Sequence, residues 1–434
     1  MRVGYTRTAL AAATAGGLAL AGLAWAAPAL AAPMAGQVPC SPGALSSAIS
    51  GAADGDVLQL ATNCTYWLTS ALPSVTVPLT IEGTHSTLRR SSSAPEFSLL
   101  TVATGGNLTV QNVNFSNGAT TGSGGAINAG DGPVSVTGGT FTGNNAADYG
   151  GAIYSDDGIS VSGATFTGNY SADYSGAIEI DDTGTVTGST FTRNTSEYGG
   201  AIDVDGTATV RASTFTTNSS SEYGGAIELD SGSLTVKKSS FYQNSSYYGG
   251  AIETESGDLT VSTGYFQQNT ADYAGGIYND DGMTLYSTGF SGNEGTYDGG
   301  GVYNEGDATV NGATFTGNTA EYGGGWYNED TVTMTGASFS SNHAEEGAGM
   351  YNEYEATVGG SGFQYNIASE GGGGLYEDGT FAHLSDSKVF SNHAPSGGGG
   401  GIYNDDTVTL VNTPVTINTV NNCSPAASVP GCTG

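Results

Sequence analysis

The sequence predicts an all-β protein, a right-handed single-stranded parallel β-helix of about 12–14 coils that is capped at both ends. Three observations support this fold class. A glycine-rich motif recurs every 24 to 27 residues, and short runs such as "TATVRA" alternate small or apolar residues with polar ones. The chain also holds 71 glycines, too many for a helical protein. A propeller blade needs about 40 residues, whereas one triangular coil of three short strands fits this period.

Two motifs mark each period. The Phe-x-x-Asn motif departs from its spacing at Phe115 and Phe390, and we expect Val389 to take the aromatic position in the last full coil. The Gly-Gly-x-aliphatic motif ends at Ile127, Ile153, Ile178, Ile202, Ile227, Ile252, Ile277, Val302, Trp326, Met350, Leu375 and Ile402. The regular Phe positions are 141, 166, 191, 215, 241, 266, 290, 315, 339 and 363.

The motif residues have structural roles in a β-helix. We expect Ile202 and Phe215 to point inward and to stack on their equivalents about 4.8 Å away in the neighbouring coils. Gly199 and Gly200 allow a turn in which a side chain would clash. Asn218 is expected to join an amide ladder with its equivalents. These are Asn144, Asn169, Asn194, Asn244, Asn269, Asn293, Asn318, Asn342 and Asn366.

The paired Gly-Gly-Ala-Ile and Phe-x-x-Asn motifs resemble the repeat of the polymorphic outer-membrane-protein family over residues 115–418. The resemblance implies a right-handed β-helix and, because members of that family are surface antigens and adhesins, a binding role. Residues 419–434 do not resemble the membrane domain of that family. We therefore expect a free, secreted protein.

The ends of the chain predict its domain organisation. Arg2 and Arg7 precede an apolar stretch, and Ala29-Leu30-Ala31 fits the cleavage rule of a secretory signal peptide, so residues 1–31 are assigned to a signal peptide. Residues 32–110 are expected to form an N-terminal cap with irregular first coils, residues 111–418 the β-helix, and residues 419–434 a disulfide-closed tail. No later stretch approaches the roughly 20 apolar residues of a membrane span.

The four cysteines lie outside the repeats, at positions 40, 64, 423 and 432. In an exported protein we expect disulfides, and of the three connectivities the local pairs Cys40–Cys64 and Cys423–Cys432 are the simplest. Each pair would close one end of the rod.

The charge balance limits the partners. The sequence has 9 basic and 41 acidic residues and a formal net charge of −32. This excludes nucleic acid and anionic membranes as favoured partners, because phosphate binding requires clustered Lys and Arg. It favours cations, basic protein surfaces or neutral glycans.

A polysaccharide-degrading enzyme of the pectin-lyase-like β-helix class, hydrolase or lyase, is the alternative function. A lyase needs a basic residue to abstract a proton, and a hydrolase needs a defined pair of carboxylates. The mature chain has few bases, and its paired turn carboxylates, such as Asp156-Asp157 and Asp405-Asp406, recur in several coils. Repeated turn acids are typical of solvated turns, so we assign no catalytic residue. The basic residues are Arg89, Arg90, Arg193, Arg211, Lys237, Lys238 and Lys388.

The residue after each inward aliphatic side chain is expected to face solvent, because strand residues alternate between faces. These residues fall into two blocks. Four successive carboxylates, Glu179, Asp203, Glu228 and Glu253, predict a column that binds Ca²⁺ or takes up protons, although no cofactor is required by the fold. Six successive tyrosines predict either stacking between coils, which would stabilise neighbouring strands, or an exposed aromatic strip for binding. They are Tyr278, Tyr303, Tyr327, Tyr351, Tyr376 and Tyr403.

A second tyrosine column precedes the glycine pairs at Tyr149, Tyr174, Tyr198 and Tyr223, each preceded by an acid. Together the columns predict a secreted, non-catalytic rod that binds a glycan or an extracellular protein surface, with self-association as a further expectation. The composition does not distinguish between these ligands.

Overall fold

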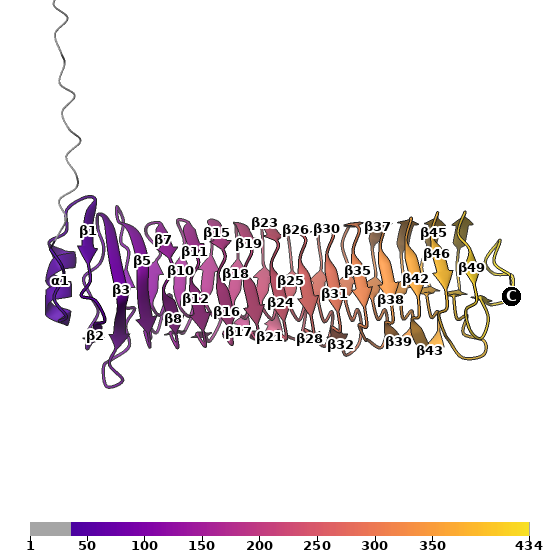
Figure 1. The fold of residues 1–434 in the computed structure, drawn as a ribbon, viewed down its shortest axis with the longest axis horizontal. Coiled ribbons are helices and arrows are strands. Elements are labelled where there is room, and N and C mark those ends of the chain that lie inside the picture. Colours follow the sequence, from indigo (N-terminus) through magenta and orange to yellow (C-terminus); the bar gives the residue numbers. More distant parts are fainter. Residues whose placement is uncertain (1–35, 434) are drawn as a thin grey trace, which may run out of the picture.

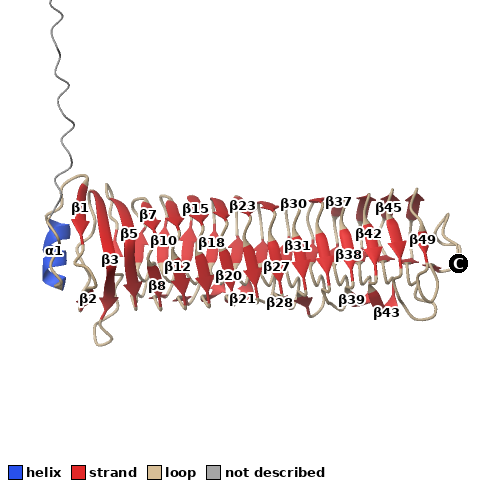
Figure 2. Cartoon of the chain, viewed as in Figure 1, coloured by secondary structure: helices blue, strands red, loops and turns tan. Residues whose placement is uncertain are grey.

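The computed structural model describes residues 36–433, so the predicted signal peptide lies outside the described residues. The chain winds into one long rod of parallel strands, with helix α1 (Pro42–Ser50) at the indigo end (Figure 1). Strands make up nearly all of its regular structure (Figure 2). The predicted parallel β-helix is confirmed.

One representative coil shows the path of the chain. Strands β18 (Ile202–Val204), β19 (Thr207–Arg211) and β20 (Thr214–Thr216) form its three sides, here called faces 1, 2 and 3. Strand β21 (Ser219–Tyr223) follows the ladder position Asn218. We call this fourth segment, between the ladder Asn and the glycine pair of the next coil, the outer arm.

Face 1 is a 14-stranded parallel sheet. Its strands are β4 (Leu100–Thr101), β6 (Ile127–Ala129), β10 (Ile153–Ser155), β14 (Ile178–Ile180), β18, β22 (Ile227–Leu229), β25 (Ile252–Thr254), β29 (Ile277–Asn279), β33 (Val302–Asn304), β36 (Trp326–Asn328), β40 (Met350–Asn352), β44 (Leu375–Glu377), β47 (Ile402–Asn404) and β50 (Cys423–Ser424).

Faces 2 and 3 belong to one 28-stranded sheet, in which β3 (Pro78–Arg90) and β5 (Asn107–Ser116) run through both. Face 2 continues with β1 (Asp56–Gln59), β7 (Val134–Thr137), β11 (Ile159–Ser162), β15 (Thr183–Thr187), β19, β23 (Ser233–Lys237), β26 (Asp258–Ser262), β30 (Met283–Tyr286), β34 (Ala308–Asn311), β37 (Thr331–Thr335), β41 (Glu355–Gly359), β45 (Phe381–Ser385) and β48 (Val408–Val411). Face 3 continues with β2 (Thr65–Leu68), β8 (Thr140–Thr142), β12 (Thr165–Thr167), β16 (Thr190–Thr192), β20, β24 (Ser240–Tyr242), β27 (Tyr265–Gln267), β31 (Gly289–Ser291), β35 (Thr314–Thr316), β38 (Ser338–Ser340), β42 (Gly362–Gln364), β46 (Lys388–Phe390) and β49 (Val415–Thr416).

The outer arms form short strands of their own. These are β9 (Asn145–Ala146), β13 (Tyr170–Ser171), β17 (Thr195–Tyr198), β21, β28 (Thr270–Ala271), β32 (Glu294–Gly295), β39 (His343–Glu346) and β43 (Ile367–Gly371). Because equivalent arms pair in parallel, each side chain of an arm meets its equivalent one coil away.

The core is built as the motifs predicted. Ile202 and Phe215 are fully buried, and the phenylalanine rings from Phe115 to Phe363 stack with centroids 4.7–4.9 Å apart. Phe115 takes a regular place in this stack despite its sequence offset, and Val389 pairs with Phe363, as expected for the last full coil. Burial of this apolar column is the main stabilising contribution of the coil.

The predicted asparagine ladder is also present. The Nδ2 atom of Asn218 donates to Oδ1 of Asn244 at 3.0 Å and to the carbonyl oxygen of Phe191 at 3.1 Å. The same pair of bonds recurs from Asn144 to Asn418, with all but the last of these side chains almost completely buried. The ladder therefore satisfies carbonyl groups that the turns leave inside the rod.

The N-terminal segment contributes strands to the first coils of the rod. Strands β1 and β2 each pair with β3, and β3 pairs with β5, so residues 56–116 already form coils and the rod has about 15 rather than 12–14. Helix α1 buries Leu45 and Ile49 at this end. The disulfides are Cys40–Cys64 and Cys423–Cys432, as predicted. No helix of the described residues is long and apolar enough to cross a membrane.

Candidate functional site

The outer arm covers face 1. At Gly199, where φ is +52°, the chain reverses so that this residue lies against the Ile202–Asp203 stretch of the strand that follows. A Cβ atom on Gly200 would collide with the carbonyl oxygen of Gly225 in the next coil. The glycine pair thus lets the arm lie on the outer side of face 1, and the equivalent positions of other coils carry only glycine or the small residues Ser175, Ala274 and Ala348.

This layer overturns one expectation from the sequence. The residues after the inward aliphatic side chains do lie on the outer side of face 1, but they do not face solvent. Tyr303 is 5% exposed and Glu179 is 1% exposed. Alternation along a strand determines on which side of the sheet a side chain lies. A second layer of chain, here the outer arm, then determines whether that side is exposed to solvent. In the carboxylate block, Glu179, Asp203, Glu228 and Glu253 are all at most 2% exposed.

The tyrosine block is a buried aromatic stack. Tyr278, Tyr303, Tyr327, Tyr351, Tyr376 and Tyr403 stack with centroids 4.6–5.1 Å apart, and only Tyr403 is half-buried. Rings of the outer arm meet this stack edge-on, for example Tyr248 on Tyr278 at 5.1 Å. The strip expected to bind ligands is therefore part of a second hydrophobic core between face 1 and the arm.

Each of the first four tyrosine hydroxyls of this block donates to a carboxylate in the turn of the next coil. The distance is 2.7 Å from Tyr278 to Glu305, 2.6 Å from Tyr303 to Glu329 and 2.7 Å from Tyr327 to Glu353. Tyr351 bonds Asp378 in the same way at 3.3 Å. The buried phenols thus have acceptors, and the turn acids have donors.

The carboxylate block lacks such complementary groups. Glu179 pairs in register with Asp203, Asp203 with Glu228, and Glu228 with Glu253. Ser175 donates to Glu179 at 2.6 Å, whereas both oxygens of Asp203 and one each of Glu228 and Glu253 have no hydrogen-bond partner among the described residues. Burial, followed by the charge of Asp203, raises the pKa of Glu179 well above its usual value.

Turn acids lie beside this block. Each acid of the carboxylate block is followed two residues later by an acid in the turn. These turn acids are Asp181, Asp205, Asp230 and Glu255. One oxygen from each of Glu179, Asp181 and Asp205 lies within 4.8 Å of the others, which makes them a candidate metal-ligand set. Burial, followed by the neighbouring Asp230, raises the pKa of Asp205 to about 7. The sequence analysis named Glu179 as a cation ligand, but it interpreted the paired turn acids, Asp181 among them, as solvated and did not name Asp205. An acid at the same turn position of each coil from Asp156 to Asp405 was the available signal.

The other tyrosine column is the one that reaches solvent. Tyr149, Tyr174, Tyr198 and Tyr223 stack with centroids 4.8–5.7 Å apart, and Tyr149 is 37% exposed while the others are half-buried. The column continues through Tyr248, Tyr273 and Tyr297. Because each ring face is covered by the next ring, the column presents ring edges and hydroxyl groups rather than open aromatic faces.

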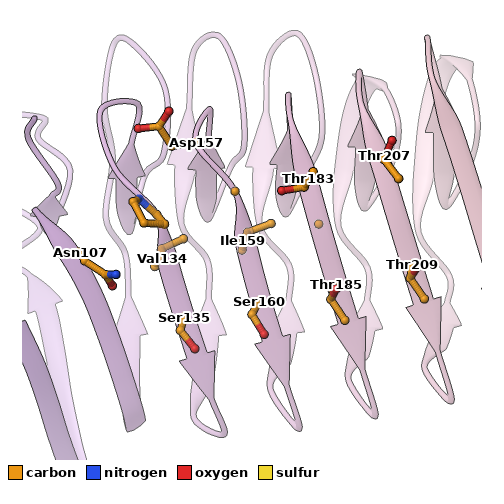
Figure 3. A pocket seen from close by; sticks show the side chains of 13 residues that line it. Asn107, Val134, Ser135, Asp157, Ile159, Ser160, Thr183, Thr185, Thr207 and Thr209 are labelled. Carbon is orange, nitrogen blue, oxygen red and sulfur yellow. The ribbon is translucent and has the colours of Figure 1, made fainter. Parts of the chain in front are cut away.

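A shallow groove of about 480 Å³ lies on face 2 (Figure 3). Ser135, Ser160, Thr185 and Thr209 form a row of hydroxyls along it, one from each successive strand (Figure 3). Among the described residues that line the groove, Asp157 is the only carboxylate. The lining therefore offers hydrogen-bonding groups to a polar ligand but does not assemble the carboxylate pair of a glycoside hydrolase.

These features define an acidic parallel β-helix protein whose face 1 carries a second layer. A family model described as the Chlamydia polymorphic membrane protein repeat matches residues 138–156. No curated protein matches the chain. The crystal structure of tailspike protein 3 of bacteriophage CBA120 is similar with a TM-score of 0.36 and 10% identity, over 89% of this chain and 59% of the tailspike chain.

Proposed function

We propose that this chain is a secreted, non-catalytic β-helical rod that binds a basic protein surface outside the cell through the tyrosine column Tyr149–Tyr297. The observation that carries the proposal is the column itself, a line of stacked, solvent-reaching tyrosines with acids beside it. The signal-peptide pattern and the two disulfides support an oxidising, extracellular location.

The chemistry of the column favours a partner rich in Lys and Arg. Asp148, Asp173, Glu197 and Glu222 directly precede the first four tyrosines, and the whole chain has a formal net charge of −32. A Lys or Arg side chain can pack its methylene groups along the ring edges while its charged end bonds a carboxylate. Tyrosine is also enriched at protein interfaces.

A glycan fits the column less well. Sugars stack on open aromatic faces, and here neighbouring rings cover those faces at interplanar angles of 13° to 22° in the first three pairs. The buried tyrosine block, Tyr278–Tyr376, is excluded from the proposed surface because its rings are at most 8% exposed.

The test is a binding array that carries basic and neutral extracellular proteins, together with neutral and acidic glycans. We expect the mature chain to bind basic proteins, and we expect the triple variant Tyr174→Ser, Tyr198→Ser, Tyr223→Ser to lose at least tenfold in affinity. The matched control is Tyr265→Ser, Tyr365→Ser, which removes exposed tyrosines outside the column (45% and 55% exposed) and should bind as the wild type does.

Equal binding by the triple variant and the control would contradict the proposal. Binding confined to glycans would replace the protein partner with a carbohydrate. Release of new reducing ends or unsaturated products from a polysaccharide would favour the alternative of a polysaccharide-degrading enzyme.

A further inference from the structure

The carboxylate block concentrates negative charge in a buried place. Glu179, Asp203, Glu228 and Glu253 lie on adjacent strands under the outer arm, and Asp181, Asp205, Asp230 and Glu255 line the turn beside them. Within residues 36–433, the side chains that donate hydrogen bonds to these eight carboxylate groups are Ser175 and Tyr154, and neither carries a positive charge. Buried carboxylates without a counter-charge are strongly unfavourable, so the block requires neutralisation by protons or by a cation.

We propose that Glu179, Asp181 and Asp205 bind a Ca²⁺ ion, with Asp203 as a further acceptor beside it. One oxygen from each of the three residues lies within 4.8 Å of the other two. Oxygen ligands lie 2.3–2.6 Å from Ca²⁺, so opposite ligands of one ion are up to roughly 5 Å apart. The spacing of the three oxygens therefore leaves room for a single ion between them.

Asp203 gives an independent indication of a missing ligand. It is 1% exposed, and both of its carboxylate oxygens are buried without a hydrogen-bond partner in the described part of the chain. Its strand position pairs with that of Glu179 in the neighbouring coil. A buried carboxylate normally accepts hydrogen bonds from protein donors, and Asp203 has none. A carboxylate without donors beside three other acids therefore indicates a site for a positive charge.

The tyrosine block supplies the internal comparison. In it, the same turn position receives a phenol hydroxyl, as in Tyr303 to Glu329 and Tyr327 to Glu353. At the start of the carboxylate block, Tyr154 of the preceding coil supplies such a donor to Asp181 at 2.8 Å. From Asp205 onward, the residue equivalent to Tyr154 in the preceding coil is an acid, Glu179 in the case of Asp205. An ionised acid donates no hydrogen bond. The cation takes the place that the phenol occupies elsewhere.

The ligand chemistry favours Ca²⁺ over Mg²⁺ and over transition metals. All candidate ligands are carboxylate oxygens, with no His or Cys among them. Ca²⁺ accepts irregular sets of six to eight oxygens, and water can complete the set, whereas Mg²⁺ requires near-octahedral geometry. The site contains none of the tyrosines of the proposed protein-binding column, and its test has its own readout.

The experiment is calorimetric titration of the chelator-treated mature chain with CaCl₂ at constant ionic strength, paired with Tb³⁺ luminescence excited through tyrosine. The Tyr154 hydroxyl bonds Asp181, so a Tb³⁺ ion in this site lies close to a donor ring. We expect saturable Ca²⁺ binding and a Tb³⁺ emission that Ca²⁺ displaces.

Two double variants decide whether the site is the one named. Glu179→Gln, Asp205→Asn should weaken Ca²⁺ binding at least tenfold and abolish the displaceable emission. Glu329→Gln, Glu353→Gln removes the same number of charges from the tyrosine block and should titrate as the wild type does. Because the amide substitutions remove repulsion between neighbouring carboxylates, we expect both variants to fold, and circular dichroism is the control for this. Absence of saturable Ca²⁺ binding in the wild type, or equal titrations of the two variants, would overturn the proposal; thermal stability that responds to pH but not to Ca²⁺ would instead assign proton uptake to the block.

Discussion

The carboxylate block and the tyrosine block share the parallel register of face 1, and both lie under an outer arm. They differ at the residue after the inward aliphatic side chain and at the next residue, which is Val204 in one block and Asn304 in the other. In the tyrosine block, stacked rings fill the space under the arm and their hydroxyls bond the turn acids. In the carboxylate block, acids meet acids, and several buried oxygens lack partners. A solenoid repeats each position, so substitutions repeated over four coils turn a hydrophobic layer into an electrostatic one while the fold stays unchanged.

The largest expected effect comes from emptying the tyrosine stack. Tyr327→Ala removes a ring that is 6% exposed and stacked on both Tyr303 and Tyr351. We expect the free energy of unfolding in urea to fall by about 3–5 kcal/mol, the usual cost of truncating a buried aromatic side chain. Tyr265→Ala, at a 45% exposed position on face 3, is the control and should change it little. A loss below about 1 kcal/mol for Tyr327→Ala would show that the arm does not pack on this stack.

The second effect is a pH dependence to which the carboxylate block contributes. Burial and neighbouring charge raise the pKa of Asp205 from 3.8 to about 7, and they raise that of Glu228 well above 4.5. Between the unfolded and the folded pKa values, the folded chain binds more protons than the unfolded chain, so the free energy of unfolding falls as the pH rises. The contribution is fully present below the unfolded pKa and is lost through the folded pKa.

In the presence of chelator, we therefore expect the melting temperature to fall between about pH 4 and pH 7. Asp203→Asn, Glu228→Gln should flatten this decline, because neither amide titrates. The tyrosine-block variant Glu329→Gln, Glu353→Gln is the control. A profile as steep in Asp203→Asn, Glu228→Gln as in the wild type would place the titrating groups elsewhere.

The smallest effect isolates the phenol–carboxylate bonds. Tyr327→Phe keeps the stacked ring but removes the hydroxyl that donates to Glu353 at 2.7 Å. We expect a loss of about 1–2 kcal/mol in the free energy of unfolding, because the partner carboxylate is partly solvated and recovers water. Tyr354→Phe, at a 42% exposed tyrosine, is the matched control. If both changes have the same effect, the hydroxyl bonds do not distinguish the two blocks.

Much of the fold could be predicted from the sequence because the sequence is periodic. The inward Ile202 and Phe215, the amide ladder through Asn218 and the turn at Gly199 each follow from a local rule applied once per coil. The burial of Glu179 and Tyr303 could not be predicted in the same way. Alternation locates them on the outer side of face 1, and nothing local shows that outer-arm residues about thirty positions earlier, such as Tyr273 for Tyr303, pack over them.

The sequence alone therefore determined the repeat, the coil and the inward columns, because each depends on spacing along the chain, whereas the structure selected one of the three possible disulfide connectivities. The tertiary structure decided which outward columns meet water and which acids share a site. Glu179 and Asp205 are 26 positions apart and come together only because successive coils stack. Burial and contacts between charges in successive coils depend on how the layers pack. A column of like residues in the sequence therefore does not show whether it is buried or exposed until that packing is known.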